Sequence, residues 1–146
     1  MAKPRSQRMH IVLTLAQKAE DDAAQKVKEQ ADLLKQEIRQ LDELKSYSGQ
    51  YLQAYANLRA GVTAQEMINY SGFISRLADA IKEQENKKER IQQGLDKLKL
   101  VWTEMHQKRK TLNDLIDRLK KEESTALEKL LQKEMDELAN RPNSLC

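Results

Sequence analysis

The sequence contains few of the residues that fill globular cores or interrupt helices. It has one Phe, one Trp and four Tyr in 146 residues, too few large side chains for an ordinary globular core. The two prolines stand near the ends, at positions 4 and 142, so nothing between them forbids continuous helix. The four glycines are scattered and form no phosphate-binding loop. These scarcities argue against a compact domain around one central core.

Cysteine and long apolar runs are equally scarce. The one cysteine, Cys146, cannot form an internal disulfide, which indicates a reducing compartment. No apolar run reaches the roughly 18 residues of a membrane-spanning helix. The first residues also lack the apolar core of a signal peptide. We therefore expect a cytoplasmic protein without direct membrane insertion.

Charged and helix-favouring residues are abundant instead. Leu, Lys, Ala, Glu and Arg make up about half of the chain, a share typical of coiled coils and long helices. The 26 basic and 23 acidic residues are interleaved and leave a net charge of +3, which does not by itself indicate a nucleic-acid partner. The composition predicts an all-α protein.

Two stretches repeat apolar residues at alternating spacings of four and three, the pattern of a left-handed coiled coil. The first stretch contains Val27, Ala31, Leu34, Ile38 and Leu41, and we expect it to continue through Ser48, Leu52 and Tyr55. The second contains Ile91, Leu95, Leu98, Trp102, Met105, Arg109, Leu112, Ile116 and Leu119.

One break separates the two stretches. Gly61 can close a helix in the left-handed conformation, and Thr63 with Glu66 forms a capping box that starts the next helix. The short connection favours antiparallel helices. We predict an antiparallel two-helix coiled coil, similar to a long α-hairpin, as a single domain over residues 1–146. Helix one should span about 6–60, the loop 61–63 and helix two about 64–139.

The two seams match when the numbers of paired residues sum to 125, which places Tyr55 opposite Tyr70. In this register, helix two extends beyond helix one from about Asp117. The extension keeps an apolar stripe, although an isolated helix of this length is marginal in water. The stripe consists of Leu127, Leu131 and Leu138. It is either frayed or covered by another protein.

Catalytic patterns are missing from the sequence. Neither His10 nor His106 has a second His or Cys at a metal-ligand spacing. A two-helix coiled coil also offers no water-excluding pocket that could tune pKa values. We expect no enzyme activity, no metal and no cofactor.

A second apolar stripe lies near the predicted loop, about a quarter turn from the seam of helix one. It includes Leu44, Tyr47 and Tyr51, with Phe73 on helix two. Exposed aromatic side chains favour a protein partner. The same rings would alternatively thicken the core where the loop separates the helices.

Polar residues form two further features. Glu20 lies one turn from Arg109 in this register, and the two side chains either pair and fix the register or extend to water. Basic residues also gather at the open end of the hairpin, among them Arg5, Arg8, Arg118, Lys120 and Lys121. With the leucine stripe beyond them, they suit insertion into a protein groove, or they are a solvated charge run.

Several local patterns resemble the FliJ family of bacterial flagellar export proteins, whose counterparts serve virulence type III secretion systems. The resemblance covers most of the chain. Its clearest elements are Leu44…Tyr47…Tyr51, Ile68-Asn-Tyr70…Phe73-Ile74…Leu77…Ala80-Ile81, Trp102, and Met135-Asp-Glu-Leu-Ala139.

The resemblance implies a non-catalytic coiled coil similar to the gamma-subunit stalk of rotary ATPases. Its open end would bind the hexameric export ATPase and promote ring assembly. Its hairpin would contact the cytoplasmic domain of the export-gate membrane protein, and the protein would also bind export chaperones. It would be peripherally associated with the inner-membrane export apparatus.

By position, the resemblance assigns one set of binding residues and one binding region. The export-gate set is Gln40, Leu44, Tyr47, Tyr51, Phe73, Leu77, Ala80 and Gln84. Position 84 is Gln here, where a relative can have His. For the ATPase the resemblance implies only a region, the first two turns of helix one and the extension of helix two. The candidate residues at this open end are Arg5, Arg8, Arg118, Lys120, Lys121, Leu127, Leu131 and Leu138.

Two functions of other classes stay open. A nucleic-acid-binding helical arm would need a basic stripe, whereas acidic residues interleave both predicted helices. A self-associating scaffold would close the wide apolar face in a four-helix bundle.

Overall fold

The computed structural model describes residues 3–57 and 62–141. Helix α1 spans Arg5–Asn57 and helix α2 spans Ala64–Ala139, and no strand occurs in these two ranges. The predicted all-α class and helical hairpin are confirmed. The last predicted turn of helix one, the expected cap at Gly61 and Cys146 lie outside the described residues.

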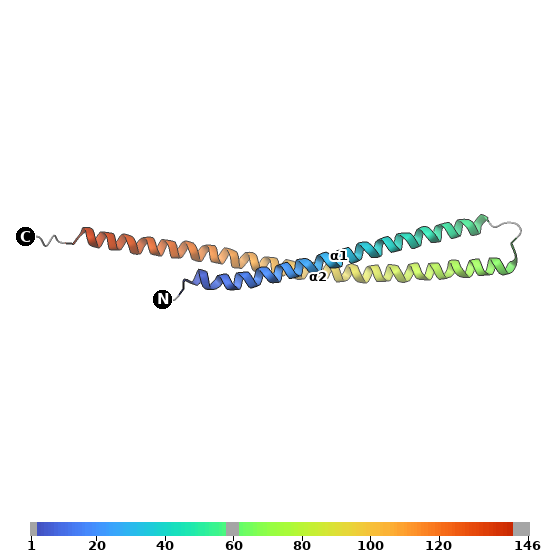
Figure 1. The fold of residues 1–146 in the computed structure, drawn as a ribbon, viewed down its shortest axis with the longest axis horizontal. Helices are drawn as coiled ribbons and strands as arrows, with labels where there is room; N and C mark the ends of the chain where they lie inside the picture. The colour runs from blue at the N-terminus through green and yellow to red at the C-terminus, as the bar shows by residue number, and fades with distance from the viewer. Residues whose placement is uncertain (1–2, 58–61, 142–146) are drawn as a thin grey trace, which may run out of the picture. The chain divides into compact units, whose positions relative to one another are not determined.

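The chain divides into two compact units, each built from a piece of both helices (Figure 1). The terminal unit consists of Met1–Asp22 with Trp102–Cys146, and the central unit consists of Ala23–Val101. Within each unit the two helices pack side by side in opposite chain directions. In the central unit, Tyr55 stacks on Tyr70 with 6.0 Å between ring centroids, so the predicted pairing near the loop is confirmed.

In the first turn of each helix, backbone amide groups donate hydrogen bonds to an acceptor just before the helix. The Glu66 amide donates to Thr63 Oγ1 at 3.1 Å, which confirms the predicted cap of α2. At the start of α1, the amides of Gln7 and Arg8 donate to the Pro4 carbonyl at 3.1 and 3.2 Å. Proline is well tolerated there because the first turn of a helix needs no amide from it.

The seam of α1 alternates spacings of three and four from end to end. Every position in it is buried or half-buried. The positions are Ser6, Met9, Leu13, Ala16, Glu20, Ala23, Val27, Gln30, Leu34, Glu37, Leu41, Leu44, Ser48, Tyr51 and Tyr55. This regular period of 3.5 residues is the pattern of a left-handed coiled coil. The nine predicted seam positions of α2, from Ile91 to Leu119, are likewise buried or half-buried.

The predicted seam of α1 is wrong at Ile38 and Leu52, which are 38% and 49% exposed. Glu37 and Tyr51 occupy the seam instead, and Glu37 is buried. The two candidates at each position are neighbours in sequence and lie about 100° apart around the helix, so the choice between them decides which side of α1 faces α2. A buried carboxylate is tolerated where partners satisfy it, and Glu37 has such partners on α2.

Polar contacts between the helices replace apolar packing at two levels of the central unit. Glu37 Oε2 accepts a hydrogen bond from Gln84 Nε2, and Glu37 Oε1 lies 3.1 Å from Lys87 Nζ. Gln30 Nε2 donates to the Ile91 carbonyl at 3.2 Å. Gly94 leaves room for this amide, because a Cβ there would stand 3.0 Å from Gln30 Nε2.

The terminal unit contains two further polar contacts. Arg109 Nε donates to Glu20 Oε2, and His106 Nδ1 lies 3.0 Å from Glu20 Oε1. The predicted pairing of Glu20 with Arg109 is therefore confirmed. Close to the start of α1, Ser6 Oγ donates to Glu123 Oε2 at 2.6 Å and the Ser6 amide donates to Glu123 Oε1 at 3.0 Å. The contact between the two helices thus reaches Glu123, beyond the predicted limit near residue 117.

A pair of leucine truncations tests which face of α1 forms the seam. Leu41→Ala should lower the free energy of unfolding by about 2–5 kcal/mol, because it removes most of a side chain that is only 2% exposed and leaves a cavity. Leu33→Ala should change it by less than about 1 kcal/mol, because Leu33 is 39% exposed. Urea unfolding followed by circular dichroism measures both. Equal losses of unfolding free energy in the two variants would show that the seam does not pass through Leu41.

The Glu20 contacts predict a specific pH dependence of stability. The hydrogen bond from Arg109, and after it that from His106, lowers the pKa of Glu20 below its ordinary value of 4.5. The stabilisation is therefore complete above about pH 4.5 and is lost as the pH falls through the folded-state value. Glu20→Gln should be less stable than the unchanged protein at pH 7, and the difference should shrink in acid.

The exposed Asp22 supplies the control for this titration, because it lies two residues away on the same helix. Asp22→Asn should leave the pH profile of unfolding unchanged, as measured by denaturant midpoints between pH 3 and pH 7. A difference between Glu20→Gln and the unchanged protein that stays constant over this range would contradict the assignment.

Candidate interaction surfaces

Five aromatic rings form one connected cluster in the central unit. Tyr51 lies at its centre, with ring centroids 4.8 Å from Tyr47, 4.7 Å from Phe73 and 5.8 Å from Tyr70. Tyr55 extends the cluster by its stacking on Tyr70. The three tyrosines of α1 recur every fourth residue and so lie along one side of that helix. The rings of both helices therefore support one another.

Tyr47 is the most accessible ring of this cluster, with 45% of its surface exposed. Its hydroxyl lies 3.1 Å from that of Tyr51, and the two share a hydrogen bond. This bond raises the pKa of Tyr47 above its ordinary value of 10.0. A shallow hollow beside it is lined by Tyr51, Asn69, Tyr70 and Phe73. The cluster presents amphipathic rings that suit contact with a protein.

The eight residues predicted for the export-gate face all lie in the central unit, but they differ in exposure. Gln40 and Tyr47 are exposed, whereas Leu44, Tyr51, Phe73, Ala80 and Gln84 are half-buried. Leu77 is 9% exposed and belongs to the packing between the helices, which corrects its placement on an open face. Leu44 and Tyr51 occupy seam positions rather than a separate stripe. The accessible part is therefore narrower than predicted and centres on Tyr47.

Gln84 has a partner inside the hairpin, since it donates to Glu37. Neither the burial of Glu37 nor the linking role of Tyr70 was predicted from the sequence. Glu37 stands next to the more hydrophobic Ile38, so hydrophobicity alone pointed to the wrong neighbour. The signal for Tyr70 was its predicted pairing with Tyr55, which placed one ring of α2 within reach of the tyrosine row.

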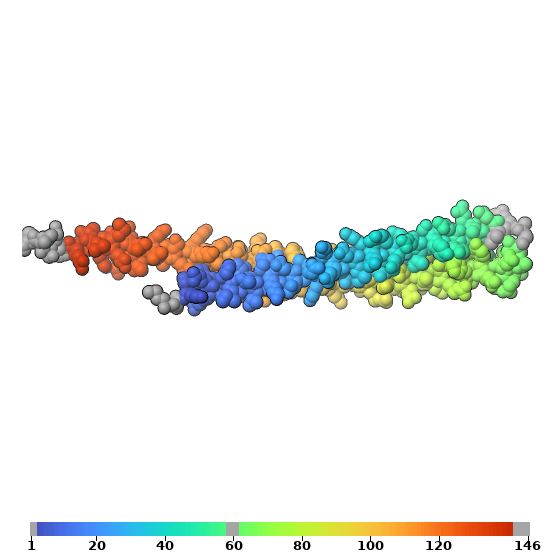
Figure 2. All heavy atoms as spheres, in the orientation of Figure 1, coloured from blue at the N-terminus to red at the C-terminus, as the bar shows by residue number. Residues whose placement is uncertain are grey.

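The open end of the terminal unit combines exposed basic and exposed apolar side chains. The predicted basic residues Arg5, Arg8, Arg118, Lys120 and Lys121 are all exposed. Beyond Glu123, every residue up to Arg141 is exposed while α2 continues to Ala139. We call residues 124–139 the α2 extension. In the view of Figure 2, no other described helix lies beside its last turns.

The predicted leucine stripe of the α2 extension is confirmed as exposed. Leu127, Leu131 and Leu138 are 56%, 50% and 66% exposed. The sequence analysis did not include Leu130 and Met135, which are exposed as well. The extension is part of α2, which continues to Ala139. Its five large apolar side chains have no covering partner among the described residues.

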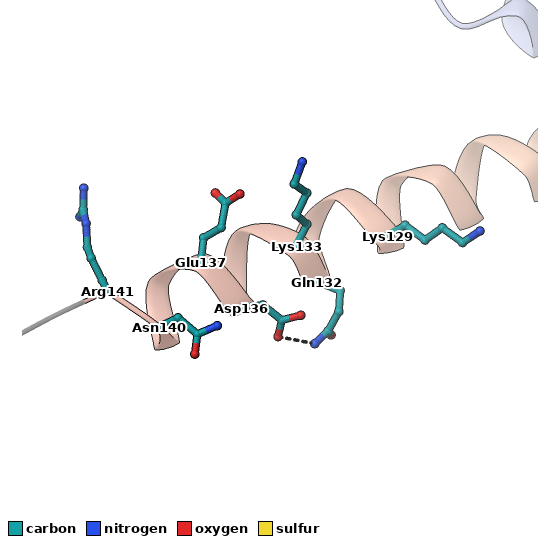
Figure 3. Close-up of a pocket in the computed structure, with 7 residues that line it drawn as sticks. All are labelled: Lys129, Gln132, Lys133, Asp136, Glu137, Asn140 and Arg141. Atoms are coloured by element: carbon teal, nitrogen blue, oxygen red, sulfur yellow. Dashed lines mark hydrogen bonds between the residues drawn. The ribbon is translucent and has the colours of Figure 1, made fainter.

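The other side of the extension is polar (Figure 3). Gln132 Nε2 donates to Asp136 Oδ1 at 3.0 Å along one row, and Lys133 and Glu137 project along another. Hollows between these side chains lie on one helix and are open to solvent. They provide no enclosed space in which a reaction could be shielded from water.

Residues 3–57 and 62–141 contain no group of three His, Cys, Asp or Glu side chains placed to hold a metal ion. Neither of the two helices, as described, contains a stretch apolar enough to span a bilayer.

Comparison with known proteins gives one family. The family model described as "Flagellar FliJ protein" matches residues 5–142. A protein of Escherichia coli (strain K12) named "Flagellar FliJ protein" is 31% identical over 128 residues, which cover 87% of each chain. No solved structure matches.

Proposed function

The chain belongs to the FliJ family and is a component of the bacterial flagellar protein export apparatus, and from that premise we propose that it is a non-catalytic adaptor between two parts of the machinery. One part is the hexameric export ATPase and the other is the cytoplasmic domain of the export-gate membrane protein. The observation that carries the proposal is that the chain offers two distinct exposed surfaces. These are the accessible part of the aromatic cluster in the central unit, which centres on Tyr47, and the α2 extension of the terminal unit.

The ATPase contact is assigned to the open end. There the α2 extension exposes its leucines, and Arg118, Lys120 and Lys121 lie just before it. Exposed apolar patches on a helix typically mark a binding surface, because an uncovered amphipathic helix is marginal in water. Insertion of this helix into the ATPase ring would cover the leucines and promote ring assembly.

The gate contact is assigned to the aromatic cluster. Tyr47 and Gln40 are accessible, and the Tyr47 ring contacts Tyr51, which in turn packs against Phe73. Tyrosines that are fixed by their neighbours lose little conformational entropy on binding, which favours them as anchors of interfaces. Export chaperones are further partners under this proposal. A peripheral position at the inner-membrane export apparatus follows from the gate contact.

A truncation tests the ATPase contact. Ending the chain after Thr125 removes the exposed leucines and keeps the contact between Ser6 and Glu123. The full chain should increase the ATP hydrolysis rate of the cognate export ATPase, and the truncated chain should lose most of that increase. The measurement is steady-state ATP hydrolysis at protein concentrations where the ATPase alone is partly assembled.

The truncated chain must keep its helical circular dichroism for this comparison, apart from the residues removed. No stimulation by the full chain, with an ATPase shown to form hexamers, would contradict the proposed ATPase contact. Equal stimulation by both chains would move the contact away from the α2 extension.

A tyrosine pair tests the gate contact. Tyr47→Ala combined with Tyr51→Ala should weaken binding to the export-gate cytoplasmic domain by about tenfold or more, because it removes the accessible ring and its support. ATPase stimulation should be largely retained. Titration calorimetry or biolayer interferometry measures the gate affinity, and circular dichroism measures the helix content.

Tyr55→Ala is the matched control, because it removes a ring of the same cluster outside the predicted gate set. It should preserve gate binding to within about threefold, in line with the near-neutral contacts that surround interface anchors. If both partner contacts fail together with the fold in the double variant, the tyrosines serve the core and the assignment is wrong.

A further inference from the structure

The two helices of the central unit contain no buried side chain near the loop that joins them. The last buried residue of α1 before the loop is Leu41, which is 2% exposed, and the first of α2 after it is Leu77, which is 9% exposed. Residues 42–57 and 64–76, which we call the hairpin tip, are all exposed or half-buried. One seam position in the tip is Ser48, which fills less space than a leucine. The tip therefore lacks the apolar burial found in the rest of the central unit.

Aromatic rings provide the contacts between the two helices of the tip. The ring centroid of Tyr51 lies 4.7 Å from that of Phe73 and 5.8 Å from that of Tyr70, and Tyr55 stacks on Tyr70. Within the two described ranges of the tip, no hydrogen bond or ion pair joins one helix to the other. Segments with little buried apolar area and few contacts to their surroundings open at lower free energy than the core of a domain.

Two glycines weaken the helices at the level of these rings. Gly49 stands between two tyrosines of α1 that belong to the aromatic cluster, and Gly72 stands between Tyr70 and Phe73 of α2. A Cβ added at either glycine would meet nothing within 4 Å, so no packing contact requires glycine there. Glycine is less favourable than alanine inside a helix. Each of the two therefore lowers the stability of its helix without a compensating contact.

The two glycines do not form a docking face of their own. Residues two apart in a helix are separated by about 160° around its axis, so Gly49 lies far from the accessible side of Tyr47. Gly72 is about 140° around α2 from Leu77, and so lies away from the seam. The two positions share their level along the hairpin rather than one surface, which favours a role in local stability.

We propose that the hairpin tip opens as one unit while the rest of the central unit stays paired, and that Gly49 and Gly72 determine how much of the open form is present. Opening separates Tyr51 from Phe73 and Tyr70, so the aromatic cluster is complete only in the closed form. A partner that contacts rings of both helices would bind the closed form and shift the tip toward it. This last step rests on the proposed function, in which the partner is the export-gate cytoplasmic domain.

Hydrogen–deuterium exchange of the full chain, resolved into short peptides by mass spectrometry, tests whether the tip opens as a unit. Amides of residues 42–57 and 64–76 should have similar protection, at least about tenfold below that of amides on the other side of Leu41 and Leu77. Fraying of each helix alone would instead give protection that rises gradually from the helix end. Such a gradient, or protection as high as in the rest of the central unit, would overturn the proposal.

Alanine variants test the role of the glycines. Gly49→Ala should raise the protection of residues 64–76 as well as that of residues 42–57, by about fourfold, because both segments open together. Gly49→Ala combined with Gly72→Ala should raise it by about tenfold or more. Because a Cβ has room at both positions, circular dichroism of these variants should show at least the helix content of the unaltered protein.

Gly94→Ala is the matched control, because it makes the same change in α2 outside the tip. It should leave the protection of the tip unchanged to within about twofold, since the tip opens separately. A rise after Gly49→Ala that is confined to α1 would show that each helix frays alone, and would overturn the proposal. Unchanged protection of the tip in the double variant would overturn the role of the glycines.

Addition of the export-gate cytoplasmic domain separates this inference from the proposed function. At a free concentration of about ten times its dissociation constant, the domain should raise the protection of both tip segments by about tenfold. Binding that leaves the protection of residues 64–76 unchanged would overturn selection of the closed form. No binding would contradict the proposed gate contact, and the exchange of the free protein would still decide whether the tip opens as a unit.

Discussion

The hydrogen-bonded carboxylates in the seam are the constraint on which the remaining contacts depend. Leucine and alanine layers in a two-helix seam tolerate sliding, because one apolar layer resembles the next. A buried glutamate does not tolerate sliding, because a shift of register separates it from its partner and leaves an uncompensated charge. Glu37 meets Gln84 and Lys87 in the central unit, and Glu20 meets Arg109 and His106 in the terminal unit. Within each unit, these contacts favour one register over its neighbours.

The register within the central unit determines which aromatic rings are accessible. With Glu37 in the seam, the position two heptads later is Tyr51, so this ring points toward α2 and meets Phe73 and Tyr70. Tyr47 is one turn earlier and lies at the edge of the seam, where it stays 45% exposed. A rotation that placed Ile38 in the seam would put Leu52 there and turn Tyr51 outward. The surface therefore depends on a buried carboxylate several turns away on the same helix.

The buried positions of a seam could be predicted from the sequence where those positions are apolar. The seam of α2 could be predicted at all nine positions, because eight are apolar and their spacing is regular. The pair of Glu20 and Arg109 followed from that seam, and the start of α2 followed from Thr63 and Glu66. The seam of α1 could not be read correctly from hydrophobicity, because its polar positions at 30 and 37 have apolar neighbours at 31 and 38. Their selection depends on partners of α2, which a local pattern does not contain.

The α2 extension shows how a helix can be suited to binding at the expense of its own stability. Its apolar side chains remain in water, and its carboxylates stand at the helix end that least favours them. A sequence selected for the isolated helix would place lysines in the last turn and polar residues on every face. The exposed leucines are unfavourable in water and would become favourable where another surface covers them. Part of the affinity for such a surface would then be the stability that the free helix lacks.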